Sequence, residues 1–175
     1  MKHYNKLPFF FILFILVSAL PACAPAGSQS YTDPFAYCAE AGTIDVPDAR
    51  YTGPALPDVI VQGYLKANSL DLSLAADENF TKMTSWRCMN SRVYACNVGA
   101  NLPCASKANL DKTPTEPMID FCKANPGSDF IPAVVTGRET VYNWVCDKEA
   151  PLAKEQLSQA DAAGFIANIW YEVKK

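Results

Sequence analysis

The chain has 175 residues, half of them hydrophobic, with 15 basic and 18 acidic side chains. This length and composition suit one domain with its own core. A net charge of −3 argues against nucleic-acid binding, which relies on clustered lysine and arginine. His3 is the only histidine, so chemistry that depends on imidazole is confined to the start of the chain.

The first 22 residues have the parts of an export signal. Lys2 and Lys6 provide positive charge, residues 8–20 form an apolar run, and small residues precede Cys23. A transmembrane helix needs about 20 apolar residues, and this run is clearly shorter. We therefore expect residues 1–22 to be a signal peptide.

The sequence Leu20-Pro21-Ala22-Cys23 resembles the lipobox of bacterial lipoproteins. The resemblance implies that Cys23 is lipidated and holds the protein at a membrane of the bacterial cell envelope, on the periplasmic side or at the cell surface. Residues 23–30 would be a flexible tether and residues 31–175 one globular domain. An ordinary secretory signal is the alternative, because Ala22-Cys23-Ala24 also fits the small-x-small cleavage pattern.

Removal of the signal leaves a mature chain without histidine. Two basic residues and no acidic residue are lost, so the net charge falls from −3 to −5. Such a chain has no Ser-His-Asp or Cys-His relay and no histidine metal site. It also has no Ser-x-x-Lys motif and no glycine-rich phosphate loop. We therefore expect no metal, no cofactor and no catalytic residue, with a pair of carboxylates as the remaining catalytic option.

The cysteines support export to an oxidising compartment. Six remain after Cys23, an even number without any Cys-x-x-Cys pair, which predicts three disulfides in place of a zinc site. Our preferred pairing, among fifteen possible ones, joins Cys88 to Cys146, Cys104 to Cys122 and Cys38 to Cys96.

Helices are predicted at two places. Residues 31–57, rich in proline and glycine, read as an irregular arm. Apolar residues at three-and-four spacing predict a helix over residues 57–67, although Gly63 weakens it. Thr113, Pro114 and Glu116 form a helix-start signal, so we expect a second helix that ends near Asn125.

Strands are predicted for most of the remaining chain. Residues 86–88 and 93–96 read as a hairpin, as do residues 130–136 and 140–146, and residues 164–173 alternate like a last strand. The expected fold is α+β: a single small disulfide-stapled domain with an antiparallel sheet and one or two short helices packed on one side.

Trp-x-Cys occurs twice, at residues 86–88 and 144–146. An aromatic surface for a glycan or an envelope protein is one reading. Its candidate residues are Trp86, Tyr94, Asn101, Arg138, Tyr142 and Trp144. The alternative, which the usual burial of tryptophan favours, is that both indoles lie in the core beside a shared Cys88–Cys146 bridge.

The predicted function is a non-enzymatic, lipid-anchored binding module of the cell envelope. A histidine-free envelope hydrolase is the alternative. Two carboxylates about 5–10 Å apart in one cleft would favour the hydrolase, because this is the arrangement in glycosidases.

Overall fold

The computed structural model describes residue 1 and residues 29–99 and 103–175. The predicted sites Cys23 and Asn101 lie outside the described residues. The described chain is a small α+β fold with antiparallel sheets, which confirms the predicted class. It has two sheets and five short α-helices, so the prediction of one sheet with one or two helices is too simple. No helix in the described ranges is long and apolar enough to cross a membrane.

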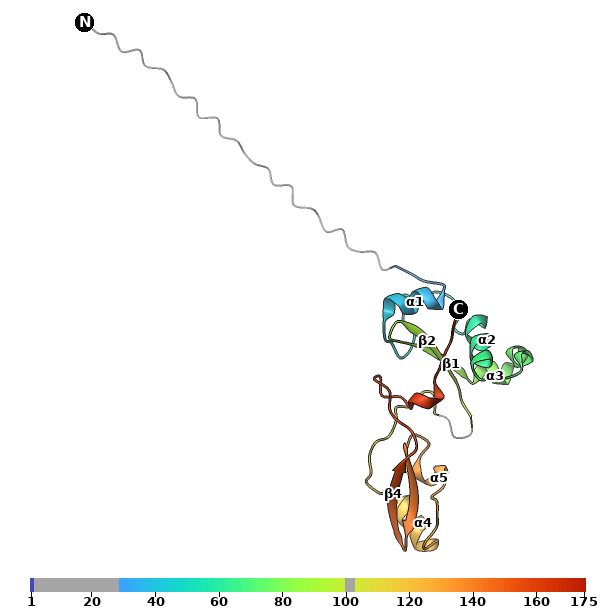
Figure 1. Cartoon of the computed structure of the whole chain (residues 1–175), viewed down its shortest axis with the longest axis vertical. Coiled ribbons are helices and arrows are strands. Elements are labelled where there is room, and N and C mark those ends of the chain that lie inside the picture. The colour runs from blue at the N-terminus through green and yellow to red at the C-terminus, as the bar shows by residue number, and fades with distance from the viewer. Residues whose placement is uncertain (2–28, 100–102) are drawn as a thin grey trace.

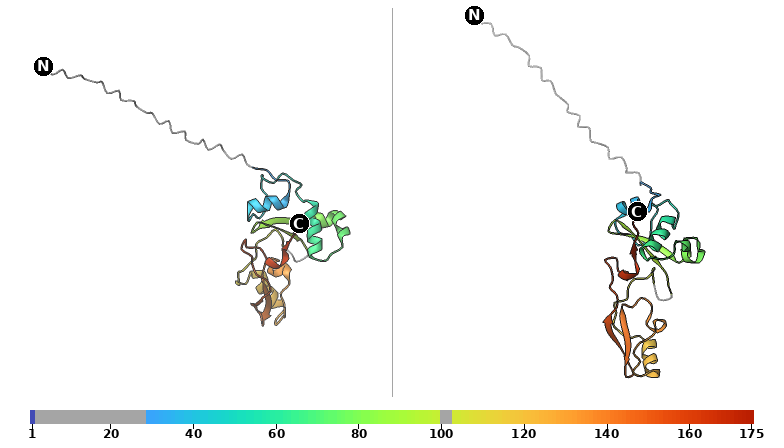
Figure 2. Two further views of the ribbon diagram at one scale, coloured as in Figure 1. Left: turned by 45° about the horizontal axis from the view of Figure 1, so that its top comes forward. Right: turned by 45° about the vertical axis from the view of Figure 1, so that its right-hand side comes forward.

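Two lobes follow one another along the long axis of the molecule (Figure 1). The first lobe contains α1 (Pro34–Ala41), α2 (Asp58–Ala67), the 3-10 helix η1 (Leu72–Ala76), α3 (Glu78–Lys82), β1 (Thr84–Met89), β2 (Arg92–Asn97) and β5 (Tyr171–Glu172). The second lobe contains α4 (Glu116–Ala124), α5 (Ala133–Thr136), β3 (Tyr142–Asp147) and β4 (Ala150–Gln156). The 3-10 helix η2 (Ala167–Ile169) lies between them, and Figure 2 shows the same separation from two other directions.

The first lobe has a three-stranded sheet in the order β1-β2-β5. The predicted hairpin of β1 and β2 is confirmed. Its turn residues Asn90 and Ser91 both have positive φ, of 52° and 62°, as the commonest two-residue hairpin turn requires. β5 joins the free side of β2, so the end of the chain returns to the first lobe.

The helix predicted over residues 57–67 is confirmed as α2. The glycine at position 63 is explained by packing. A Cβ at this position would overlap the side chain of Val173, so glycine lets the C-terminal segment approach the helix.

The prediction that residues 31–57 form an irregular arm is wrong in part, because α1 forms within them. Asp33 caps α1 by accepting a hydrogen bond from the Phe35 N–H, and Pro34 opens the helix.

The second lobe corrects two predictions. α4 begins at Glu116 with Thr115 as its N-cap, two residues later than the Thr113 signal predicted. The predicted pairing of residues 130–136 with residues 140–146 is wrong. The second of these strands is confirmed as β3, but residues 133–136 form α5, and β3 pairs with β4. β4 escapes sequence prediction because it contains Pro151, lysine and glutamate, which strands usually avoid.

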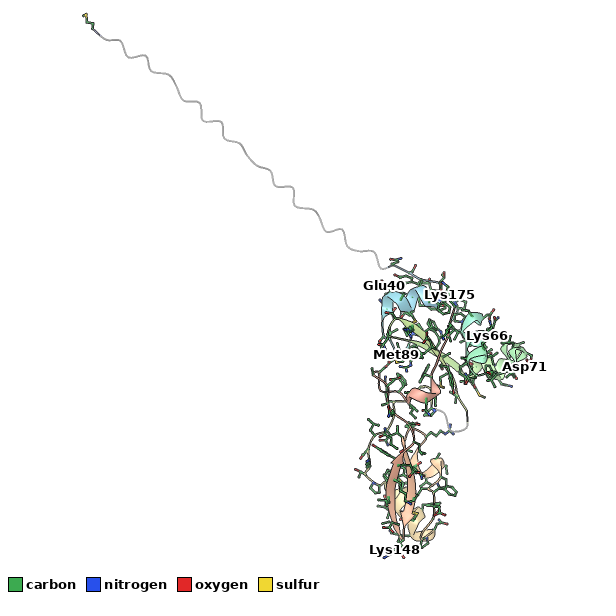
Figure 3. All side chains as sticks on the ribbon, viewed as in Figure 1. Glu40, Lys66, Asp71, Met89, Lys148 and Lys175 are labelled. Atoms are coloured by element: carbon green, nitrogen blue, oxygen red, sulfur yellow. A yellow bond between two sulfur atoms is a disulfide. The ribbon has the colours of Figure 1, made fainter. Side chains whose placement is uncertain are left out.

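The C-terminal segment is the largest correction. The period-two alternation of residues 164–173 predicted a strand, but only Tyr171–Glu172 is one. Phe165, Ile166, Ile169 and Trp170 are all buried because the segment crosses the face of the first-lobe sheet and packs on more than one side. Lys175, at the end of this segment, pairs with Asp33 beside α1, and Lys148 marks the opposite tip of the molecule (Figure 3).

Three disulfides join all six remaining cysteines, as predicted, but the preferred pairing is wrong at every bridge. The bridges are Cys38–Cys88, Cys96–Cys104 and Cys122–Cys146. Each lies in a different hydrophobic cluster, one in the first lobe, one between the lobes and one in the second lobe. The shared Cys88–Cys146 bridge fails because β1 and β3 belong to different sheets.

Candidate functional site

A cleft of about 460 Å³ lies beside β1, and we call it the aromatic cleft. Segments from five parts of the chain meet there: the loop after α1, the loop before α2, the start of β1, the segment around Cys104 and the segment around η2. Its lining residues are Asp45, Val46, Pro47, Ala55, Thr84, Ser85, Trp86, Cys104, Ala105, Lys107, Phe165 and Trp170.

β1 provides one wall of the aromatic cleft. Alternation along the strand places Trp86 on the sheet face that packs against α1 and α2, and Arg87 on the opposite face. The Trp86 indole N–H donates to the carbonyl oxygen of Ala55 at 2.8 Å, and its ring meets that of Tyr51 edge-on at 4.9 Å. Trp86 is only 5% exposed, so this wall is held rigidly from behind.

Phe165 and Trp170 form the second wall. Their rings lie 5.6 Å apart in an edge-to-face arrangement. The guanidinium of Arg87 lies 4.3 Å from the Phe165 ring centre and 4.5 Å from that of Trp170, close enough for cation–π attraction to both. Arg87 therefore connects the sheet to this wall.

A buried ion pair fixes the second wall in place. Arg87 is fully buried, and its Nη2 pairs with the carboxylate of Asp161. The other oxygen of Asp161 accepts hydrogen bonds from the N–H groups of Ala163 and Phe165, at 2.8 and 3.1 Å. Among the described residues, the Nε and Nη1 of Arg87 have no hydrogen-bond partner, so the aromatic rings and Asp161 are its main compensation.

One ion pair forms the charged rim of the aromatic cleft. Lys107 Nζ lies 2.5 Å from the carboxylate of Asp45 and 2.7 Å from the carbonyl oxygen of Ala163. The same ammonium group lies 3.6 Å from the centre of the Phe165 ring. Asp45 is the one carboxylate in the lining, and it is already engaged by Lys107.

The resolved pKa shifts show carboxylates held in their ionised form. Hydrogen bonds from Arg50 lower the pKa of Asp48 from 3.8 to about 2. Hydrogen bonds from Ser73 likewise lower the pKa of Asp71. A catalytic general acid needs the opposite shift. The pKa of Tyr51, behind Trp86, is raised by burial.

The described cavities do not have the carboxylate pair of a glycosidase. Five cavities lined by residues 29–99 and 103–175 have at most one carboxylate each. The largest, of about 580 Å³, has Glu139 and Arg138 in its lining. No group of three or more potential metal-binding side chains occurs within these same ranges.

The structure does not bring the predicted surface residues together. Trp86 lines the aromatic cleft, Arg138 lines a different cavity, and Trp144 is buried in the second lobe. Tyr94 and Tyr142 are half-buried supports of the clusters between and within the lobes. Both tryptophans of the Trp-x-Cys motifs are buried, as the core alternative predicts, although beside separate disulfides.

Sequence reasoning missed most of the residues that form the aromatic cleft. Phe165 was assigned to a strand, and Asp45 and Lys107 carried no motif. One signal was available in the sequence. Arg87 lies between Trp86 and Cys88 in a predicted strand of buried residues, and an arginine that is buried needs a charged partner. That partner, Asp161, lies too far along the chain to be found from spacing.

The comparisons with known proteins do not add a family. No protein-family model, no curated protein and no solved structure matches the chain.

Proposed function

We propose that this chain is a lipid-anchored protein of the bacterial cell envelope that binds a partner molecule, without catalysis, in the aromatic cleft. The observation that carries the proposal is the construction of the cleft. Two tryptophans and a phenylalanine wall it, and the ion pair of the buried Arg87 with Asp161 and the Cys96–Cys104 bridge hold those walls. Rigid aromatic walls with a few polar groups at the rim are typical of binding sites.

Two features support the proposed compartment. The lipobox resemblance at Leu20–Cys23 supports export and anchoring, and three disulfides support an oxidising environment. A lipid anchor keeps a binding module at a membrane surface, where an envelope glycan or an envelope protein is the expected partner.

Binding is favoured over hydrolysis by the charges in the aromatic cleft. Glycoside hydrolysis needs two carboxylates, one of them able to give up a proton. Asp45 is alone and pairs with Lys107, and Thr84, Ser85 and the aromatic rings offer only neutral contacts. Such a lining suits recognition of a ligand with apolar faces and hydrogen-bonding edges.

Anchoring is tested by Cys23→Ser. Two acyl chains give stable membrane attachment, so the unmodified variant should move from the membrane fraction to the soluble envelope fraction. Labelling with a clickable palmitate analogue should mark the natural chain and not the variant. A natural chain that is already soluble after export would contradict the lipid anchor.

Binding is tested by filling the aromatic cleft. Ala55 is exposed and lines the cleft, so Ala55→Arg should block it without disturbing the core; Ala39→Arg, on the exposed side of α1, is the matched control. Both variants and the natural chain are screened against an array of envelope glycans and a displayed library of heptapeptides. Probes that bind the natural chain and the control, but not Ala55→Arg, support the proposal; equal binding to all three chains contradicts it.

A further inference from the structure

The two lobes contain the same small unit, a helix joined by a disulfide to the first strand of a hairpin. Trp86 and Cys88 pair with Ala95 and Val93, and Trp144 and Cys146 pair with Ala153 and Pro151. In both hairpins the turn has two residues, and the cysteine fastens the strand to a helix earlier in the chain, α1 or α4. The two hairpins can therefore be compared position by position.

In the second lobe, the chain itself covers the outer edge of β3. Ile131 N–H donates to the Trp144 carbonyl oxygen at 2.7 Å, and Cys146 N–H donates to the carbonyl oxygen of Ser128 at 2.8 Å. Residues 128–131 thus lie along the edge, and Ile131 is buried in the cluster of that lobe. The main chain of the second-lobe tryptophan has an intramolecular partner.

In the first lobe, only the cysteine has such a partner. Cys88 exchanges two main-chain hydrogen bonds with Ile44, at 3.0 and 3.1 Å. Along an antiparallel strand, every second residue points its N–H and carbonyl groups to the same side. Trp86 lies two residues before Cys88, so its main-chain groups also point to this outer edge. The contact of Val93 with Val173 on the other side of β2 agrees with this alternation.

The edge at Trp86 is unpaired among the described residues and lies beside the aromatic cleft. After Ile44 the chain turns into residues 45–47, which line the cleft and do not continue beside β1. Within residues 29–99 and 103–175, no hydrogen-bond partner is found for the main-chain N–H or carbonyl of Trp86. An unpaired strand edge of this kind is a template for an added strand.

We propose that the edge of β1 at Thr84–Trp86 binds an extended peptide segment of another envelope protein, which occupies the place that residues 128–131 occupy beside β3. The inference rests on the proposed function, because it names the ligand of the aromatic cleft. Extended peptides carry a donor and an acceptor at the spacing that a strand edge presents, and glycans do not.

The cleft also specifies the side chain and the source of this peptide. Val46, Pro47, Trp170 and Phe165 surround the place beside the edge, so an apolar residue is expected there, as Ile131 is in the second lobe. The unpaired stretch is only three residues long, and Thr84 and Trp86 within it are buried, which disfavours edge-to-edge pairing of two folded copies. A flexible segment of a partner fits this space.

The experiment uses heptapeptides selected from a displayed library on the mature chain. The best peptide is made in the natural form and with N-methyl groups on alternate residues, which remove main-chain donors. One of the two methylation patterns should weaken binding about tenfold or more, and the other should not. Peptide binding should slow hydrogen exchange of the Trp86 amide about tenfold and leave that of Arg87, which pairs with Tyr94, unchanged.

Each other outcome overturns the inference in a distinguishable way. A glycan that binds the cleft while no peptide does would leave the proposed function standing and refute the peptide. Peptide binding without slower exchange at Trp86 would do the same. Protection of Trp86 that rises with protein concentration alone would assign the edge to a second copy. Both proposals would be refuted if every probe that binds the control Ala39→Arg also binds Ala55→Arg.

Discussion

The two lobes build on the same helix–disulfide–hairpin unit but complete it in different ways. In the first lobe, β5 adds a third strand, and the C-terminal segment covers the second face of the sheet around Arg87. In the second lobe the sheet has two strands, and β4 leaves most of its side chains exposed. A two-stranded sheet is marginally stable by itself. The comparison teaches that the same helix–disulfide–hairpin unit forms with the same strand pairing in both lobes. Its stability and its use as a binding site depend on the segments that pack around it.

The two lobes also differ in what lies beside the outer edge of the first hairpin strand. The second lobe uses residues 128–131 to close the edge beside Trp144, which yields a covered hairpin. The first lobe leaves the corresponding edge at Trp86 beside the aromatic cleft. The same sequence pattern, Trp-x-Cys, thus contributes to a core in both lobes and to the wall of a candidate site in only one.

The largest effects are expected from the two tryptophans. Trp86 and Trp144 are 5% and 4% exposed, so Trp86→Ala and Trp144→Ala should each lower the free energy of unfolding by about 3–5 kcal/mol. They lie in separate clusters, so their losses should add. Chemical denaturation measures the loss, and hydrogen exchange should show that each variant loosens its own lobe. Losses below about 1 kcal/mol would mean that the rings are not core residues.

The second prediction addresses what the first lobe has and the second lacks. Asp161→Ala removes the partner of the fully buried Arg87, which should cost about 3–5 kcal/mol because an uncompensated charge is left in the core. Asp120→Ala, which breaks an exposed pair with Lys123, should cost no more than about 1 kcal/mol. Equal effects in the two variants, measured by denaturation, would show that the buried pair does not hold the second wall of the aromatic cleft.

The third prediction ranks the disulfides. The bridges close separations of 50, 24 and 8 residues, and their loss should cost about 4 kcal/mol for Cys38–Cys88, about 3.5 for Cys122–Cys146 and about 2.5 for Cys96–Cys104. Paired cysteine-to-alanine variants and denaturation give the ranking. If the second lobe depends on its bridge more than the first, Cys122–Cys146 will exceed its place in this order, which would sharpen the comparison. Free thiols in the native oxidised chain would contradict the framework.

The smallest effect tests how the C-terminal segment docks on α2. Gly63→Ala improves helix propensity, but the added Cβ overlaps Val173, so we expect a net loss of about 1–3 kcal/mol from overpacking. Gln62→Ala, at an exposed position of the same helix, should change stability by no more than about 0.5 kcal/mol. A stabilised Gly63→Ala variant would show that β5 can move away from α2 at little cost.

Several features could be predicted because neighbouring residues decide them. The β1–β2 hairpin and α2 follow from periodicity, and the start of α4 was missed by only two residues. The six cysteines that follow Cys23 predict three bridges without knowledge of the fold. The α+β class follows from the same local signals. β4 shows the limit, since Pro151 and its charged residues carry no strand signal and pairing with β3 decides their conformation.

The sequence by itself determined the number of cysteines, the confinement of the single histidine to position 3 and the local elements, because each depends on composition or on residues close together. Only the tertiary structure decided which cysteines pair, since pairing requires that α1 lie beside β1 and α4 beside β3. It also decided that residues 164–173 cross a sheet face, because alternation cannot distinguish a strand from a segment buried on several sides. The aromatic cleft belongs to this second class: its walls come from residues about 80 positions apart in sequence, and the buried pair of Arg87 and Asp161, 74 residues apart, brings them together.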